Sequence, residues 1–98
     1  MIIDDILESL ERDGSGRYVL RPRGVQELAR KLRAIDDPAP LERALSQLVR
    51  FGCYLVMLPA GGYAARTLWT LAESQIARLT DPRAALEKYR RLIGVRSR

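Results

Sequence analysis

Apolar residues recur at helical spacing over most of this chain, and turn-forming residues separate the helical stretches. Intervals of three and four residues place these apolar side chains on one face of a helix. Proline opens two of the stretches, at Pro38 and Pro82, where its missing N–H costs nothing. The pattern predicts helices over residues 1–12, 24–35, 38–51, 72–79 and 82–93.

Three other stretches have the character of strands. Residues 17–21 alternate between the two faces of a strand and are followed by a proline, which predicts a brief or edge strand. Residues 53–58 are continuously apolar, and residues 63–71 follow after a short turn. We predict that these two stretches pair as a β-hairpin, with Gly61 and Gly62 free to adopt positive φ at its tip. The alternation does not settle the register.

Together these elements predict an α+β, mainly helical fold in one domain of 98 residues. The predicted order from residue 1 to residue 71 is helix, strand, helix, helix and hairpin. Residues 72–98 form a helical extension. This extension either packs on the same domain or serves for dimerisation.

The net charge of +5 is unevenly distributed along the chain. Residues 17–33 hold six basic residues and one acidic residue, as do residues 83–98, whereas residues 1–16 hold five acidic residues and one basic residue. Two basic blocks suit a polyanionic partner, nucleic acid above all. The alternative is that the arginines only keep a small protein soluble.

Side chains for catalysis are scarce. The chain has no histidine and a single cysteine, Cys53, which excludes the usual zinc sites, a Cys/His nucleophilic pair and an internal disulfide. Acidic pairs at residues 4–5 and 36–37 are explained by helix starts, where the helix dipole and the first N–H groups favour carboxylates. We therefore predict a protein that is not an enzyme and that has no metal or cofactor.

We expect neither a membrane-spanning segment nor a secretory signal peptide. The longest apolar run, residues 53–58, is too short to cross a bilayer. The N-terminus carries Asp4 and Asp5 instead of the basic residues of a signal peptide. We therefore expect a cytoplasmic protein that does not bind a membrane.

Three stretches of the chain resemble the winged helix-turn-helix superfamily: ELARKLRAI at 27–35, LERALSQLVRFG at 41–52 and AGGYAAR at 60–66. Within the superfamily, the last two stretches are similar to the N-terminal DNA-binding domain of type IV (abortive-infection) antitoxins and related small regulators. The resemblance implies a winged helix over residues 1–71 with one or two extra C-terminal helices. It also implies a recognition helix at about 38–51, which enters the major groove, and a β-hairpin wing at about 59–66.

The same resemblance implies two groups of DNA-binding residues. The recognition helix would present Arg43, Ser46, Gln47 and Arg50 to base edges and phosphates. The wing and the segment before the second helix would present Tyr63, Arg66, Arg17, Arg21 and Arg23 to the backbone or minor groove. Glu42 shares the recognition face, where it can accept a hydrogen bond from cytosine but repels phosphate. The alternative for Tyr63 is a core or strand-pairing position.

We expect a DNA-binding transcriptional regulator, a repressor or antitoxin-like protein that binds double-stranded DNA as a homodimer through its C-terminal helices. The alternative is a protein-interaction adaptor or a small phage-type inhibitor that binds a protein or ribonucleoprotein complex. Glu42 and the acidic first helix favour this alternative, since uneven charge also steers protein partners.

Overall fold

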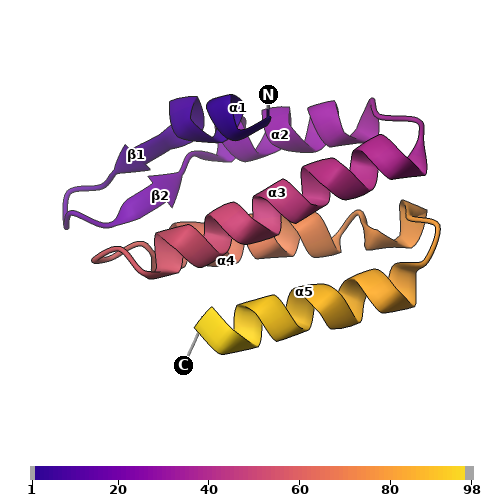
Figure 1. Ribbon diagram of the computed structural model, residues 1–98. Helices are drawn as coiled ribbons and strands as arrows, with labels where there is room; N and C mark the ends of the chain where they lie inside the picture. Colours follow the sequence, from indigo (N-terminus) through magenta and orange to yellow (C-terminus); the bar gives the residue numbers. More distant parts are fainter. Residues whose placement is uncertain (1, 97–98) are drawn as a thin grey trace.

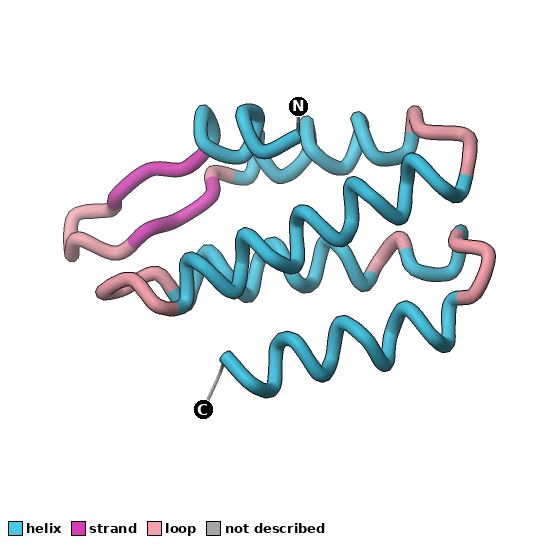
Figure 2. Tube along the Cα trace, viewed as in Figure 1, coloured by secondary structure: helices cyan, strands magenta, loops and turns pink. Residues whose placement is uncertain are grey.

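Helix α3 (Pro38–Val56) runs through the middle of the molecule, and the other elements are arranged around it (Figures 1 and 2). The computed structural model describes residues 2–96, and the side chains of residues 2–94. The remaining elements are α1 (Ile2–Ser9), β1 (Leu10–Arg12), β2 (Tyr18–Leu20), α2 (Pro22–Arg33), α4 (Gly62–Glu73), the 3-10 helix η1 (Ile76–Arg78) and α5 (Pro82–Arg96). The fold is therefore mainly helical and α+β. Residues 1 and 97–98, the ends of the predicted ranges, lie outside the described residues.

The core is built on α3. Its buried residues Leu41, Leu45, Leu48, Gly52 and Leu55 follow one another at intervals of three and four, as the helical pattern requires. Helix α4 packs against α3 over most of its length, while α5 and α1 also pack against α3 (Figure 1). These contacts leave one long face of α3 exposed to solvent.

The β-hairpin predicted over residues 53–71 is wrong. Residues 53–56 continue α3 without a break, and residues 62–73 form α4. The wing predicted at residues 59–66 is accordingly a short loop followed by the first turns of α4. The boundary predicted between residues 71 and 72 falls inside this helix.

Gly52, which follows the predicted end of its helix at residue 51, lies inside α3 and faces α4. A Cβ atom at this position would overlap Nε1 of Trp69 and stand 2.9 Å from its Cδ1. The glycine therefore lets the indole of α4 pack directly on the backbone of α3. Helix α4 itself is held by a buried stripe at helical spacing, which the strand prediction overlooked: Ala64, Ala65, Leu68 and Ala72.

Along the chain, the two strands between α1 and α2 form a small antiparallel sheet. Leu10 of β1 pairs with Leu20 of β2, and Arg12 pairs with Tyr18. The strand predicted at residues 17–21 is confirmed as β2, but its partner is the end of the predicted first helix, which stops at Ser9. The N–H of Tyr18 donates to the carbonyl of Ala60 over 3.0 Å, so the hairpin is fastened to the loop between α3 and α4.

The other predicted helices are confirmed with shifted ends. Helices α3 and α5 begin at Pro38 and Pro82 as predicted, and α2 begins at Pro22, two residues earlier than expected. The helix predicted at residues 72–79 is divided between the end of α4 and η1. None of the described helices combines the length and the apolar character needed to cross a bilayer.

Asp13 closes the turn between β1 and β2. Its Oδ1 atom accepts hydrogen bonds from the Ser15 hydroxyl at 2.8 Å, the Ser15 N–H at 2.9 Å and the Arg17 N–H at 3.0 Å. The Ser15 hydroxyl and the Arg17 N–H are the main causes that lower the pKa of Asp13 from 3.8 to about 2. The carboxylate, not the carboxylic acid, is therefore the form that fits this turn.

We expect the Asp13 carboxyl to titrate near pH 2 in the folded protein. Because its pKa is lower in the folded than in the unfolded chain, its contribution to stability is present above pH 3.8 and is lost as the pH falls toward 2. Carboxyl chemical shifts recorded by NMR as the pH is lowered measure this midpoint, and Asp13→Asn should remove it. A midpoint near 3.8 would contradict the hydrogen-bonded turn.

Candidate nucleic-acid interface

The exposed face of α3 gathers the four residues predicted for its recognition surface. Arg43 and Arg50 are exposed, and Ser46 and Gln47 are half-buried. These positions share one side of the helix because steps of three, four and seven residues return to the same face. The structure therefore brings Arg43, Ser46, Gln47 and Arg50 together.

A groove of about 450 Å³ separates this face from α5. From α3 it is lined by Ala39, Glu42, Arg43, Ser46, Gln47 and Arg50, and from α5 by Lys88. We call this set of residues the α3–α5 groove. Arg43 and Gln47 also line a second groove, on the side of α3 that faces α1 and α2. The exposed face of α3 is thus a ridge between two depressions.

The three cations of the α3–α5 groove are not neutralised by the protein itself. Arg43, Arg50 and Lys88 are exposed, and no ion pair joins any of them to a carboxylate within the described part of the chain. Glu42 is the one acidic residue among those that line the groove. The groove therefore carries an excess of positive charge that is available to a ligand.

Tyr89 holds the two walls of this groove together. Its side chain is fully buried between α5 and α3, and its hydroxyl lies 3.4 Å from Oγ of Ser46, where either group can donate. Burial raises the pKa of Tyr89; the hydrogen bond with Ser46 acts in the opposite direction, and the charge of Glu42 raises it further. The buried Tyr89 thus anchors this part of α5, including the neighbouring Lys88, beside α3.

Arg17, Tyr63 and Arg66 form a separate group near the start of α4. The guanidinium carbon of Arg17 lies 6.0 Å from the centroid of the Tyr63 ring, and Arg17 also pairs with Asp13. Tyr63 and Arg66 line a groove with Val25 of α2. They belong to a helix, not to the wing, and line none of the grooves beside α3.

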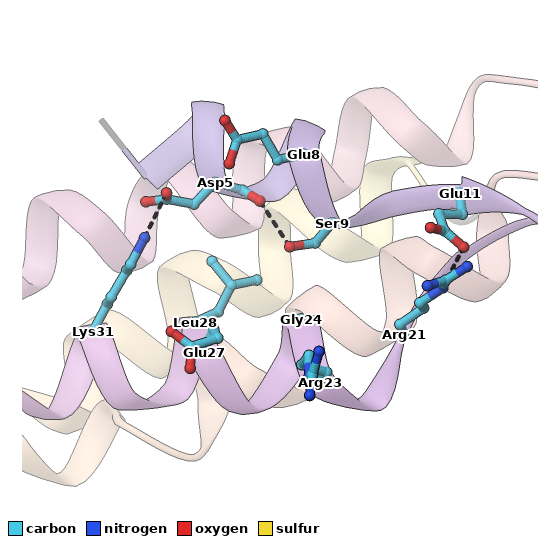
Figure 3. Close-up of a pocket in the computed structure, with 10 residues that line it drawn as sticks. All are labelled: Asp5, Glu8, Ser9, Glu11, Arg21, Arg23, Gly24, Glu27, Leu28 and Lys31. Carbon is cyan, nitrogen blue, oxygen red and sulfur yellow. Dashed lines mark hydrogen bonds and ion pairs between the residues drawn. The ribbon is translucent and has the colours of Figure 1, made fainter.

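Arg21 and Arg23 lie in a third place, a groove of about 350 Å³ between α1 and α2 (Figure 3). Nε of Arg21 is 2.5 Å from Oε2 of Glu11, and Nζ of Lys31 is 2.6 Å from Oδ1 of Asp5. Four acidic and three basic residues line this groove, so its charge is almost balanced by internal ion pairs. Such a surface has little attraction for a polyanion.

The nine predicted residues thus divide into three groups, and the first gains a partner that sequence reasoning missed. Lys88 lies more than thirty residues after Arg50, within a helix whose basic character is evident from the sequence but whose place in the fold is not. In a helix over residues 82–93, the neighbouring Tyr89 shares an apolar face with Ala85 and Leu86, and this places Lys88 beside the buried face. The position of Lys88 next to an apolar face can be read from the sequence, but the sequence does not show that this face packs against α3.

No protein-family model, curated protein or solved structure matches this chain. Among the described residues, no three His, Cys, Asp or Glu side chains lie close enough together to hold a metal ion. The α3–α5 groove is the strongest concentration of unpaired charge among the grooves described above, and it is therefore the best candidate for a functional surface.

Proposed function

We propose that this protein binds double-stranded DNA through the α3–α5 groove and acts as a transcriptional regulator, repressor or antitoxin-like. The observation that carries the proposal is the row of unpaired cations, Arg43, Arg50 and Lys88, on two packed helices. Cations that neutralise phosphates release condensed counterions, which is the main source of affinity for duplex DNA. In the groove between α1 and α2, Arg21 and Lys31 are already paired with carboxylates, so they would release fewer counterions from DNA.

The spacing of these groups supports contact with a duplex. Arg43 and Arg50 are seven residues apart on α3, a distance of about 10 Å along the helix axis. This is close to three base-pair steps of about 3.4 Å. The two guanidiniums would contact phosphates or guanine, and Gln47 and Ser46 between them would contact base edges. Glu42 would limit which bases are accepted nearby.

The proposal retains the helix-turn-helix that the resemblance to the winged helix-turn-helix superfamily implies, but not the wing. Helices α2 and α3 are joined by residues 34–37, a connection of the length found in helix-turn-helix motifs, with α3 as the recognition helix. The proposal includes no wing at residues 59–66, since that segment leads into α4. The homodimer expected through the C-terminal helices stays a prediction, which sedimentation equilibrium tests directly.

We expect the triple variant Arg43→Ala, Arg50→Ala and Lys88→Ala to lose most of its affinity for duplex DNA. Fluorescence anisotropy with a short labelled duplex, at about 50 mM and about 200 mM salt, measures both the affinity and its salt dependence. Each phosphate contact removed should reduce the slope of log K against log salt by about 0.9, or by roughly 3 for the triple variant. The affinity at the lower salt should fall about tenfold or more.

A matched control removes the same charge elsewhere. Arg33, Arg83 and Arg90 are exposed, form no ion pair among the described residues and line none of the grooves described above. Replacing these three by alanine should reduce the affinity much less than the groove variant does. Equal losses in the two variants, or no binding of the wild-type protein at the lower salt, would overturn the proposal.

A second candidate function, binding to a protein or ribonucleoprotein, is favoured by one observation. Tyr54 and Met57, near the C-terminal end of α3, are 51% and 58% exposed, and they share a small groove with Arg50 and Leu92. Exposed aromatic residues and methionine beside arginine are typical of protein interfaces. A wild-type protein that binds no duplex, together with a protein partner whose binding Tyr54→Ala abolishes, would favour this candidate over the first.

A further inference from the structure

The outer face of α4 forms a groove that differs in chemistry from the α3–α5 groove. It has a volume of about 460 Å³ and is walled by α4 and by Val25 of α2. Leu71 and Val25 give it an apolar lining, and Arg66 is the one charged residue among those that line it. An apolar groove with a single cation at its edge suits a ligand that is part flat and hydrophobic and part anionic.

Tyr63 is the most exposed large hydrophobic residue in the described part of the chain, at 59%. It lies on the outer side of α4 because the inner side is occupied by the buried residues Ala64, Ala65 and Leu68. Arg17, whose guanidinium carbon lies 6.0 Å from the Tyr63 ring centroid, is a second cation near this end of the groove, although Asp13 partly neutralises it through an ion pair of 3.3 Å. An accessible aromatic ring with arginine residues nearby suits the binding of an unpaired base and its phosphate.

Two of the three serine and threonine residues that line the groove, Thr67 and Ser74, donate their protons to carbonyls of α4. Oγ1 of Thr67 donates to the carbonyl of Tyr63 over 3.1 Å, and Oγ of Ser74 donates to the carbonyl of Leu71 over 2.6 Å. Their protons are therefore used within the helix, while their lone pairs can still accept hydrogen bonds. Acceptors on the wall suit the N–H groups of a base edge, and Arg66 and Arg17 supply the positive charge for an anion.

We propose that this groove binds a single-stranded segment of nucleic acid. One unpaired base stacks on Tyr63, the adjoining phosphate lies between Arg66 and Arg17, and the next base covers Val25 and Leu71. This inference rests on the proposed function in that the ligand is again nucleic acid. It concerns a different helix and a different form of the ligand, so the two proposals fail separately.

Fluorescence anisotropy with labelled oligothymidylate, and with a duplex as comparison, tests the inference on the full chain. Tyr63→Ala should weaken binding to the single strand about tenfold, since stacking of one base on an aromatic ring is removed. Tyr63→Phe keeps the ring and should bind within about twofold of the wild type. Arg66→Ala should reduce the salt slope for the single strand by about 0.7.

Both tyrosine variants are expected to fold, because the Tyr63 side chain is 59% exposed and lies outside the core; circular dichroism verifies this. Unchanged single-strand affinity in Tyr63→Ala, or an equal loss in Tyr63→Phe, overturns the inference. So does a wild-type protein that binds duplex but no single strand, a result that leaves the proposed function standing. If Tyr63→Ala loses the single strand while the triple variant of the α3–α5 groove keeps the duplex, the inference holds and the proposed function fails.

Discussion

We expect Gly52→Ala to reduce the free energy of unfolding by about 2–3 kcal/mol, a large part of the ~5–15 kcal/mol that a small domain has. The added Cβ atom would overlap Nε1 of Trp69 and stand 2.9 Å from Cδ1 and 3.1 Å from Cε2. The indole must then move away from α3, and it donates a buried hydrogen bond of 3.2 Å to the carbonyl of Val49. Overpacking and loss of this bond together exceed the gain of about 1 kcal/mol in helix propensity.

Urea denaturation followed by circular dichroism measures this loss, and Gly94→Ala is the matched control. Gly94 also lies in a helix, α5, but a Cβ atom there meets nothing within 4 Å. The control should be between neutral and about 1 kcal/mol more stable, because only the propensity changes. Combining Gly52→Ala with Trp69→Phe should cost less than the sum of the single changes, since the smaller ring relieves the overlap. A Gly52→Ala protein as stable as the control would contradict the close approach of α3 and α4.

We expect Arg78→Ala to cost about 2 kcal/mol, although its side chain is partly exposed. Nη1 donates to the carbonyl of Leu32 over 3.1 Å and to Oε1 of Gln75 over 2.8 Å, and Nη2 donates to the carbonyls of Arg33 and Ile35. The last carbonyls of a helix have no partner within the helix, and a cation beside them also meets the negative end of the helix dipole. One guanidinium thus joins η1 to the end of α2.

A lysine substitution distinguishes the hydrogen bonds of Arg78 from a general effect of its positive charge. Arg78→Lys keeps the charge but lacks the planar set of donors, so it should recover no more than about half of the stability lost in Arg78→Ala. Arg83→Ala removes an exposed arginine that lines no described groove and should change the stability by less than about 0.5 kcal/mol. The midpoint and slope of urea unfolding give these values. Equal stability of the lysine variant and the wild type would show that charge alone is sufficient.

Local pattern is enough to predict several elements and one face of the candidate site. The helices that begin at Pro38 and Pro82 are predictable because helical hydrogen bonds join residues four apart, so amphipathic spacing and a proline start are local signals. The same periodicity places Arg43, Ser46, Gln47 and Arg50 on one face without knowledge of any other element. Their shared orientation follows from the geometry of a single helix.

The error over residues 53–71 has a physical cause. Residues 53–58 are apolar at every position, including the exposed Tyr54 and Met57, so they have no periodicity that separates a helix from a strand. Glycine ends many helices, but Gly52 is retained within one because Trp69, seventeen residues later, occupies the space beside it. That packing is not local, and no pattern around Gly52 reveals it.

The basic character of the chain, its helical content and the side of α3 that carries Arg43 and Arg50 follow from residue type and spacing alone. Tertiary packing decided the rest. It formed α4 where a wing was predicted and placed Tyr63 and Arg66 in a groove away from the exposed face of α3. It also placed Arg21 and Arg23 in a groove lined by acidic residues. Packing of Tyr89 against Ser46 brought Lys88 to Arg43 and Arg50. The backbone of a helix sets which of its own residues share a face. Which two helices lie side by side depends instead on which apolar faces bury each other.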